Sequence, residues 1–149
     1  MPFVTIIIPY KSNLKYLFLA LNSVFNQSYK NFKLIIIYDN IYKIDLEKIK
    51  IFLKKKKYLK KYNIKIIVNK KNLGAGESRN IAIRKSNTKY IAFLDSDDIW
   101  SKNKLKIQVE HMEKNNISFS HTSYNIISSN NKILSYQIAK NEIFFKDLI

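Results

Sequence analysis

The stretch YIAFLDSDD, residues 90–98, joins a short apolar run to three carboxylates. Its apolar part predicts a buried strand over residues 90–94, because the run is short, continuous and rich in aromatic and aliphatic side chains. Asp95, Asp97 and Asp98 follow at once. Open α/β sheets bind their ligands outside the carboxyl ends of the strands. The stretch therefore predicts both a strand of such a sheet and the edge at which a site forms.

Similar apolar runs precede this stretch, and a helical pattern separates each from the next. Predicted strands cover residues 3–9, 32–38 and 64–69. Predicted helices cover residues 13–27, 44–62 and 77–85, the last after a loop at 72–76, and a further helix carries Leu105, Val109 and Met112 on one face. Two more strands are predicted at 117–127 and 133–138, around a polar turn. This alternation predicts one α/β domain over residues 1–149, with a mostly parallel sheet covered by helices on both faces.

The composition excludes several classes of site and leaves two explanations for the charge. There is no cysteine, so disulfides, zinc–thiolate sites and thiol nucleophiles are ruled out. The net charge of +16 fits a polyanionic partner, either nucleic acid or an anionic membrane, but it also fits a biased genome whose AT-rich codons enrich Lys, Asn and Ile. Only Arg79 and Arg84 are arginines. A protein that reads nucleic acid favours arginine, so a basic nucleic-acid-binding domain is the remote alternative.

The location is predicted from what the sequence lacks. No signal peptide is visible, because the apolar run at 3–9 is too short and has no basic segment before it. No apolar run approaches the roughly 20 residues that a membrane helix needs. We expect a cytoplasmic protein that contacts the inner face of the cell membrane through its positive charge.

The three carboxylates at 95–98 are the strongest chemical signal. Like charges this close raise one another's pKa, and a divalent cation would relieve the repulsion. Hard oxygen ligands of this kind suit Mg²⁺ or Mn²⁺, which keep open positions for substrate phosphates. The alternative is a helix N-cap, a role that suits Asp98.

Two further features have an ordinary structural explanation beside the functional one. In NLGAGESRN, residues 72–80, a turn with Gly74 and Gly76 leads into a helix that carries Arg79. Its backbone N–H groups and the guanidinium suit a diphosphate, but the glycines could merely shape a turn while Arg79 pairs with an acid of the sheet. Asp39 ends the second strand, where it suits either a base or ribose contact or a plain turn.

Taken together, four blocks resemble family 2 glycosyltransferases of the GT-A fold, a Rossmann-like, mostly parallel sheet flanked by helices. The resemblance covers residues 4–124, and the blocks are VTIIIP at 4–9, LNSVFNQSY at 21–29, NLGAGESRN at 72–80 and LDSDD at 94–98. It implies transfer of a sugar from a UDP- or dTDP-sugar to an acceptor hydroxyl, with inversion, usually in cell-envelope polysaccharide synthesis. A non-catalytic or remnant nucleotide-sugar-binding module is the alternative.

The resemblance also assigns roles to residues. Asp39 would hold the nucleobase, Asp97 would be the main metal ligand, and Asp95 would lie near both the ribose and the metal. The remaining donor-binding residues would be Pro9, Tyr10, Lys11, Asn72, Gly74, Arg79 and Ser96. The sequence departs from the family at Tyr38, where an acid is usual, and at Tyr10, Lys11 and Ser12, where Thr-Tyr-Asn is usual.

The resemblance sets expectations for the acceptor side as well. In the family the catalytic base follows the D-x-D element by a long stretch, so we expect the base beyond Ile149 and the fold truncated at its C-terminal end, without the acceptor half. The expected partners are the nucleotide-sugar and a glycan or lipid-linked acceptor. A second copy of the chain is a further expected partner, because a truncated sheet exposes an edge.

Overall fold

The computed structural model describes residues 3–128, 130 and 132–139. The chain divides into two compact units, which meet in the sequence between Ile107 and Gln108. The first unit contains β1 (Val4–Tyr10), α1 (Leu14–Phe25), β2 (Phe32–Tyr38), α2 (Ile44–Lys55), α3 (Tyr58–Lys61), β3 (Asn63–Val68), α4 (Gly74–Arg84) and β4 (Tyr90–Phe93). Helix α5 (Lys104–Asn115) begins in the first unit and ends in the second, which also contains β5 (Tyr124–Ile127) and β6 (Ile133–Gln137).

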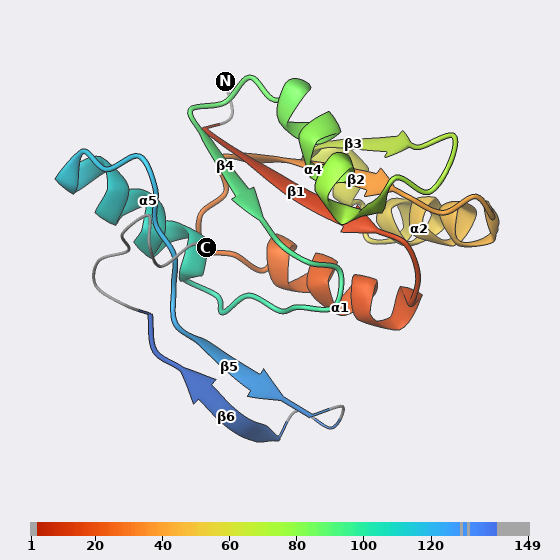
Figure 1. Ribbon diagram of the computed structural model, residues 1–149. Helices are drawn as coiled ribbons and strands as arrows, with labels where there is room; N and C mark the ends of the chain where they lie inside the picture. Colours follow the sequence, from red (N-terminus) through yellow and green to blue (C-terminus); the bar gives the residue numbers. More distant parts are fainter. Residues whose placement is uncertain (1–2, 129, 131, 140–149) are drawn as a thin grey trace. The chain divides into compact units, whose positions relative to one another are not determined.

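Four parallel strands form the sheet of the first unit, in the order β3-β2-β1-β4 (Figure 1). In this register Ile7 of β1 pairs with Ile35 of β2 on one side and with Phe93 of β4 on the other. Both central strands are buried along their whole length. Strands that are covered on both faces need apolar side chains pointing both ways, which explains why β1 and β2 are mostly apolar, with three isoleucines in each. The predicted α/β fold with a parallel sheet is confirmed.

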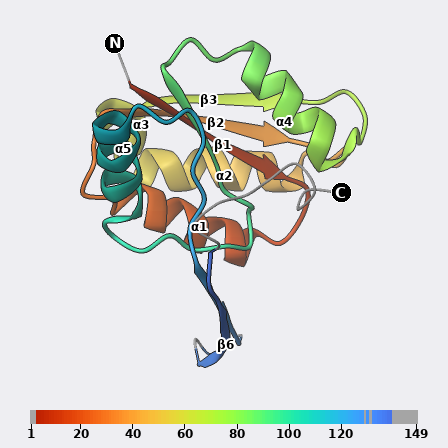
Figure 2. The same ribbon diagram turned by 60° about the vertical axis from the view of Figure 1, so that its left-hand side comes forward.

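Helices cover both faces of this sheet. Helix α4 lies on one face, and α1 and α2 lie on the other (Figure 2). Under α4, Ala82 packs with Ile7, Ile35 and Ile37 in one apolar cluster. On the opposite side, the rings of Phe18 in α1 and Phe52 in α2 stack 4.2 Å apart. The sheet is therefore fixed on both sides, which holds the ends of its strands in place.

The helix predicted over residues 44–62 is in fact two helices. The helix is interrupted at Lys57, which adopts a left-handed conformation with φ of 57°, and α3 is a single turn after it. This break brings the ring of Tyr58 to 3.7 Å from that of Phe25. No glycine or proline marks the position, so the apolar pattern alone did not reveal it.

The predictions for two other segments were partly wrong. Residues 117–123 are not a strand, and β5 begins only at Tyr124. Helix α5 ends at Asn115, and Asn116 then takes a left-handed conformation (φ 51°) that asparagine tolerates well. The predicted loop at 72–76 is also shorter than expected, because α4 already begins at Gly74.

The face of α5 was predicted correctly, since Leu105, Val109 and Met112 are all buried.

In the second unit, β5 and β6 form the predicted antiparallel pair, with Tyr124 opposite Gln137. Both strands are exposed along their whole length. Among the described residues no helix is both long and apolar enough to cross a membrane.

Candidate functional site

The predicted site residues gather at the carboxyl edge of the sheet. The ends of β1 and β2 are tied together there, because the backbone N–H of Asp39 donates to the carbonyl oxygen of Tyr10 at 2.7 Å. Strand β4 joins the same edge, where the N–H of Leu94 donates to the carbonyl oxygen of Ile7 at 3.1 Å. The edge therefore carries the Pro9–Lys11 segment, Asp39 and the carboxylates that follow β4.

Asp39 is buried at this edge, with 3% of its surface exposed, and accepts three hydrogen bonds. Its Oδ1 accepts from the Nδ2 of Asn69 and from the backbone N–H of Leu73, both at 2.8 Å. Its Oδ2 accepts from the backbone N–H of Gly74, also at 2.8 Å. The N-terminal N–H groups of a helix lack partners within the helix and need a cap. Asp39 supplies that cap for α4 from another strand.

The cap is extended by a second buried layer of polar side chains. The Nδ2 of Asn69 also lies 3.1 Å from the hydroxyl oxygen of Ser78 in α4, and its backbone N–H donates to the carbonyl oxygen of Tyr38. Both Asn69 and Ser78 are buried. They were missed in the sequence, where a lone Asn after a strand and a lone Ser in a helix give little signal. The network joins the ends of β2 and β3 to the start of α4.

Gly74 stands in this turn with φ of +82°. Residues with a side chain rarely adopt that conformation, whereas glycine does so at little cost. Its place between the β3 end and α4 explains why one of only two glycines in the chain lies here. This geometry agrees with the prediction that a glycine shapes the turn.

Arg79, one turn into α4, reaches across to the end of β4. Its Nη2 lies 2.5 Å from Oδ1 of Asp95, and both side chains are partly exposed. Of the two explanations that the sequence left open, an ion pair with an acid of the sheet is therefore present. The pair brings the glycine turn and the carboxylate cluster together in one place.

The other two carboxylates of the cluster differ from Asp95. Asp97 is exposed, and within the described part of the chain no hydrogen bond or ion pair engages its carboxylate. The pKa of Asp98 is raised by partial burial of its carboxyl group and by the charges of Asp97 and Asp95. This agrees with the predicted repulsion. Residues 3–128, 130 and 132–139 contain no group of three or more acidic, histidine or cysteine side chains placed to hold a metal.

The segment after the carboxylates is fastened to α1 by residues that the sequence did not single out as functional. Gln27 is fully buried; its Nε2 donates to the carbonyl oxygen of Ser101 at 2.7 Å, and its Oε1 accepts from the N–H of Leu105 at 2.9 Å. The N–H of Trp100 donates to the hydroxyl oxygen of Ser23 at 3.1 Å. Ser23 and Gln27 belong to the quoted block at 21–29, which was the available signal. They hold the segment at 100–105, which follows Asp97 in the chain.

At the end of β1, the predicted donor residues divide into buried and exposed ones. Pro9 and Tyr10 are buried, and the Tyr10 hydroxyl donates to Asp45 of α2 at 2.7 Å. The pKa of Tyr10 is raised, mainly by burial and then by Asp45. Lys11 is exposed. A direct ligand contact at this position is therefore open to Lys11, while Tyr10 secures α2 to the sheet.

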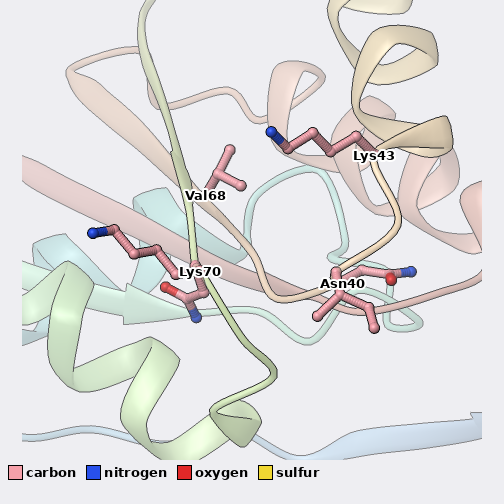
Figure 3. Close-up of a pocket in the computed structure, with 6 residues that line it drawn as sticks. Asn40, Lys43, Val68 and Lys70 are labelled. Carbon is pink, nitrogen blue, oxygen red and sulfur yellow. The ribbon is translucent and has the colours of Figure 1, made fainter.

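A pocket of about 410 Å³ opens beside Asp39, beyond the ends of β2 and β3 (Figure 3). None of its lining residues was predicted as a site residue. They are Asn40, Ile41, Lys43, Val68, Asn69 and Lys70. Asn69 therefore links this pocket to the Asp39 network.

Comparison with known proteins gives consistent matches. The family model described as "Glycosyl transferase family 2" matches residues 5–148. An uncharacterized glycosyltransferase of Rickettsia bellii is 43% identical over 131 residues, 88% of this chain and 18% of that protein. The Escherichia coli protein "UDP-Glc:alpha-D-GlcNAc-diphosphoundecaprenol beta-1,3-glucosyltransferase WfgD" is 36% identical over 130 residues, 87% of this chain and 48% of that protein.

A solved structure is similar as well. The crystal structure of S. aureus TarS residues 1–349 in complex with UDP-GlcNAc superposes with a TM-score of 0.64 at 26% identity, and the match covers 75% of this chain and 31% of TarS. The chain thus spans about half of the E. coli relative and a smaller share of the other two proteins.

Proposed function

The chain belongs to glycosyl transferase family 2, and we propose that it forms the donor-binding part of an enzyme that transfers a sugar from a UDP- or dTDP-sugar to an acceptor hydroxyl. One observation carries the donor site: the Arg79–Asp95 pair and the Asp97 carboxylate, which no described residue engages, lie together at the carboxyl edge of a parallel sheet. A cation and open carboxylates at one place suit a diphosphate with its metal ion.

On the donor side, Lys11 and Arg79 supply positive charge for the diphosphate. Asn72 and Gly74 form the turn whose backbone approaches it, and Ser96 lies between the two metal-binding carboxylates. Pro9 and Tyr10 shape the wall at the end of β1. Asp39 holds the turn through its three hydrogen bonds and keeps one acceptor position on Oδ2 for the nucleobase.

A Mg²⁺ or Mn²⁺ ion fits the residues present. Such ions are held in proteins by one or two carboxylates, with waters and substrate phosphates filling the other positions. Asp97 is available as the main ligand, and Asp95 becomes the second when Arg79 turns to the phosphates. The ion supplies electrostatic stabilisation of the nucleoside diphosphate that leaves.

For the acceptor we propose a lipid-linked glycan of cell-envelope polysaccharide synthesis, used at the inner face of the cell membrane. The E. coli relative is named for an acceptor with a diphosphoundecaprenol group. The positive charge of the chain agrees with work near anionic lipid. No described residue is assigned as the catalytic base.

Calorimetric titration of the purified chain with UDP tests the donor site. We expect binding in Mn²⁺ that is lost in EDTA, and at least about tenfold weaker binding for Asp97→Asn. Glu47→Gln is the matched control, since it removes an exposed acid from α2 and should leave the affinity unchanged.

Each other outcome decides a separate point. Failure of a folded sample to bind UDP in either condition would refute the donor site. Binding that survives both EDTA and Asp97→Asn would refute the metal while keeping the nucleotide. Binding without turnover on any lipid-linked acceptor would favour a non-catalytic nucleotide-sugar-binding module.

A further inference from the structure

The loop between β2 and α2, together with the first residue of α2, exposes a run of apolar side chains. Ile41, Tyr42 and Ile44 are 58%, 69% and 71% exposed, and they lie within four positions. Single exposed apolar residues are ordinary on protein surfaces, but neighbouring ones mark contact with an apolar partner. Lys43 stands among them.

This loop is held in place by two hydrogen bonds to the backbone of Tyr42 and by one from Asn40 to the backbone of Lys11. The Tyr38 hydroxyl donates to the carbonyl oxygen of Tyr42 at 2.5 Å, and the N–H of Tyr42 donates to Oδ1 of Asn40 at 2.9 Å. The Nδ2 of Asn40 donates to the carbonyl oxygen of Lys11 at 2.8 Å. The first two bonds use backbone atoms of Tyr42, so its ring takes no part in them. The apolar side chains are therefore presented outward on a fixed backbone.

The pocket beside this loop adds positive charge. Lys43 and Lys70 lie on either side of Val68, which is itself exposed (Figure 3). None of the described residues that line the pocket is acidic. Among the described residues neither lysine forms an ion pair. The side chains of Lys43 and Lys70 thus flank the apolar side chain of Val68.

The acids nearest in sequence do not cancel this charge. Asp39 is buried, and its carboxylate already accepts three hydrogen bonds. Asp45 accepts from the Tyr10 hydroxyl and lies 4.0 Å from Lys48, and Glu47 pairs with Lys50 at 2.6 Å. The surface made of residues 41–44 and Lys70, called here the 41–44 surface, is both apolar and cationic.

We propose that the 41–44 surface docks on a membrane rich in anionic lipids. Ile41, Tyr42 and Ile44 enter the interface between head groups and acyl chains, while Lys43 and Lys70 pair with lipid phosphates. This combination of apolar residues with adjacent lysines is the chemistry by which proteins attach to such surfaces. Nucleic acid would engage the lysines but leave the aliphatic side chains exposed, which favours lipid over that partner. The proposal extends the lipid-linked acceptor suggested above, yet lipid binding needs no donor.

Cosedimentation with vesicles tests this directly. The full chain is mixed with vesicles of phosphatidylglycerol and phosphatidylethanolamine, and separately with vesicles of phosphatidylcholine. We expect binding to the anionic vesicles and little to the neutral ones. Lys43→Ser with Lys70→Ser should weaken binding about thirtyfold, since each lysine near an anionic surface contributes roughly a factor of five. Ile41→Ser with Tyr42→Ser should weaken it at least about tenfold.

Matched controls separate this surface from the general charge of the chain. Lys54→Ser with Lys55→Ser removes the same charge from the other end of α2, and Ile107→Ser removes an apolar side chain that is 62% exposed on α5. Both controls should keep at least about a third of the wild-type affinity, because among the described residues neither site places three exposed apolar side chains within four positions. All positions are exposed, and circular dichroism verifies that each variant is folded.

Three results would overturn the proposal: no binding of the wild-type chain to anionic vesicles, an equal loss in the Lys54/Lys55 control, or no loss on removing Ile41 and Tyr42. The UDP titration is run on the same samples. A chain that binds vesicles through this surface but does not bind UDP refutes the donor site alone, and the reverse result refutes the docking surface alone.

Discussion

Replacing Asp39 by Asn tests whether this carboxylate holds the fold of the site. The change keeps the size of the side chain and one acceptor oxygen, which can still serve Asn69 and Leu73. The other oxygen becomes an NH₂ group, so two donors face one another where Oδ2 now accepts from the N–H of Gly74 at 2.8 Å. The substitution therefore removes one charge-assisted hydrogen bond and creates a repulsive contact at the start of α4.

The expected loss of stability is about 2 kcal/mol. A hydrogen bond to a charged group contributes about 1.5–3 kcal/mol, and loss of a helix cap costs about 0.5–2 kcal/mol. These describe the same interaction and are not added. Asp39→Ala should cost more, about 3 kcal/mol, because the buried Nδ2 of Asn69 loses its better acceptor.

Urea unfolding followed by the fluorescence of Trp100, the only tryptophan, measures this loss. For a slope of about 2 kcal/mol per molar urea, the midpoint should fall by about 1 M in Asp39→Asn. Asp45→Asn is the control: it also replaces a hydrogen-bonded Asp near the edge, but its single bond from Tyr10 can be kept by the amide oxygen. We expect it to lose less than about 1 kcal/mol. Equal midpoints for Asp39→Asn and Asp45→Asn would refute the capping role of Asp39.

Two further predictions concern charge and backbone strain. Burial lowers the pKa of Lys104 to about 8, and its ammonium group lies 4.0 Å from the centre of the Trp100 ring. We therefore expect the fluorescence of Trp100 to change with pH near 8 in the wild-type chain. The same change should be absent in Lys104→Met. Because the folded pKa lies below the ordinary value of 10.5, the folded chain releases this proton first, so urea midpoints should rise from about pH 8 toward pH 10 in the wild type more than in the variant. Lys57→Gly should stabilise the chain by about 1 kcal/mol, because Lys57 has a φ of 57°, whereas Lys56→Gly, at a residue with negative φ, should not raise the urea midpoint.

The sequence predicted the sheet better than the segments that leave it. Strand β2 has the predicted bounds, because a buried parallel strand needs an uninterrupted apolar run and Phe32–Tyr38 supplies one. The start of α4 was placed too late, because its cap comes from Asp39, 34 and 35 positions earlier in the chain. A pattern search over neighbouring residues does not see a cap from another strand. The break at Lys57 was missed for a related reason, since the aromatic packing of Tyr58 favours it and no local signal does.

The predicted site residues gather at one edge of the sheet, as the parallel topology implied, while the contacts of each side chain there depend on neighbouring strands. Carboxylates after β4 and a turn before α4 were visible as motifs, and parallel topology brings them to one edge. The sequence left two alternatives for Arg79, a contact with a diphosphate or an ion pair with an acid of the sheet. Only the structure shows that Arg79 pairs with Asp95. Gln27 and Asn69 were missed because the sequence alone does not distinguish a buried amide side chain from an exposed one.

Three of the four carboxylates at this edge, Asp39, Asp95 and Asp97, differ in the hydrogen bonds and ion pairs that they already make with protein groups, and this difference orders their proposed roles. Asp39 is buried and accepts three hydrogen bonds, so the fold loses much without it, and a ligand can use only the remaining acceptor position on Oδ2. Asp95 is held by Arg79, so a cation reaches it only when that arginine finds another anion. Asp97 has no such competitor in the part of the chain that the structure describes. A metal ion should therefore bind first at Asp97, and a donor diphosphate that attracts Arg79 would release Asp95 as the second ligand. On this reasoning nucleotide and metal each strengthen the binding of the other, because the phosphate that Arg79 contacts is also the group that frees a ligand for the ion.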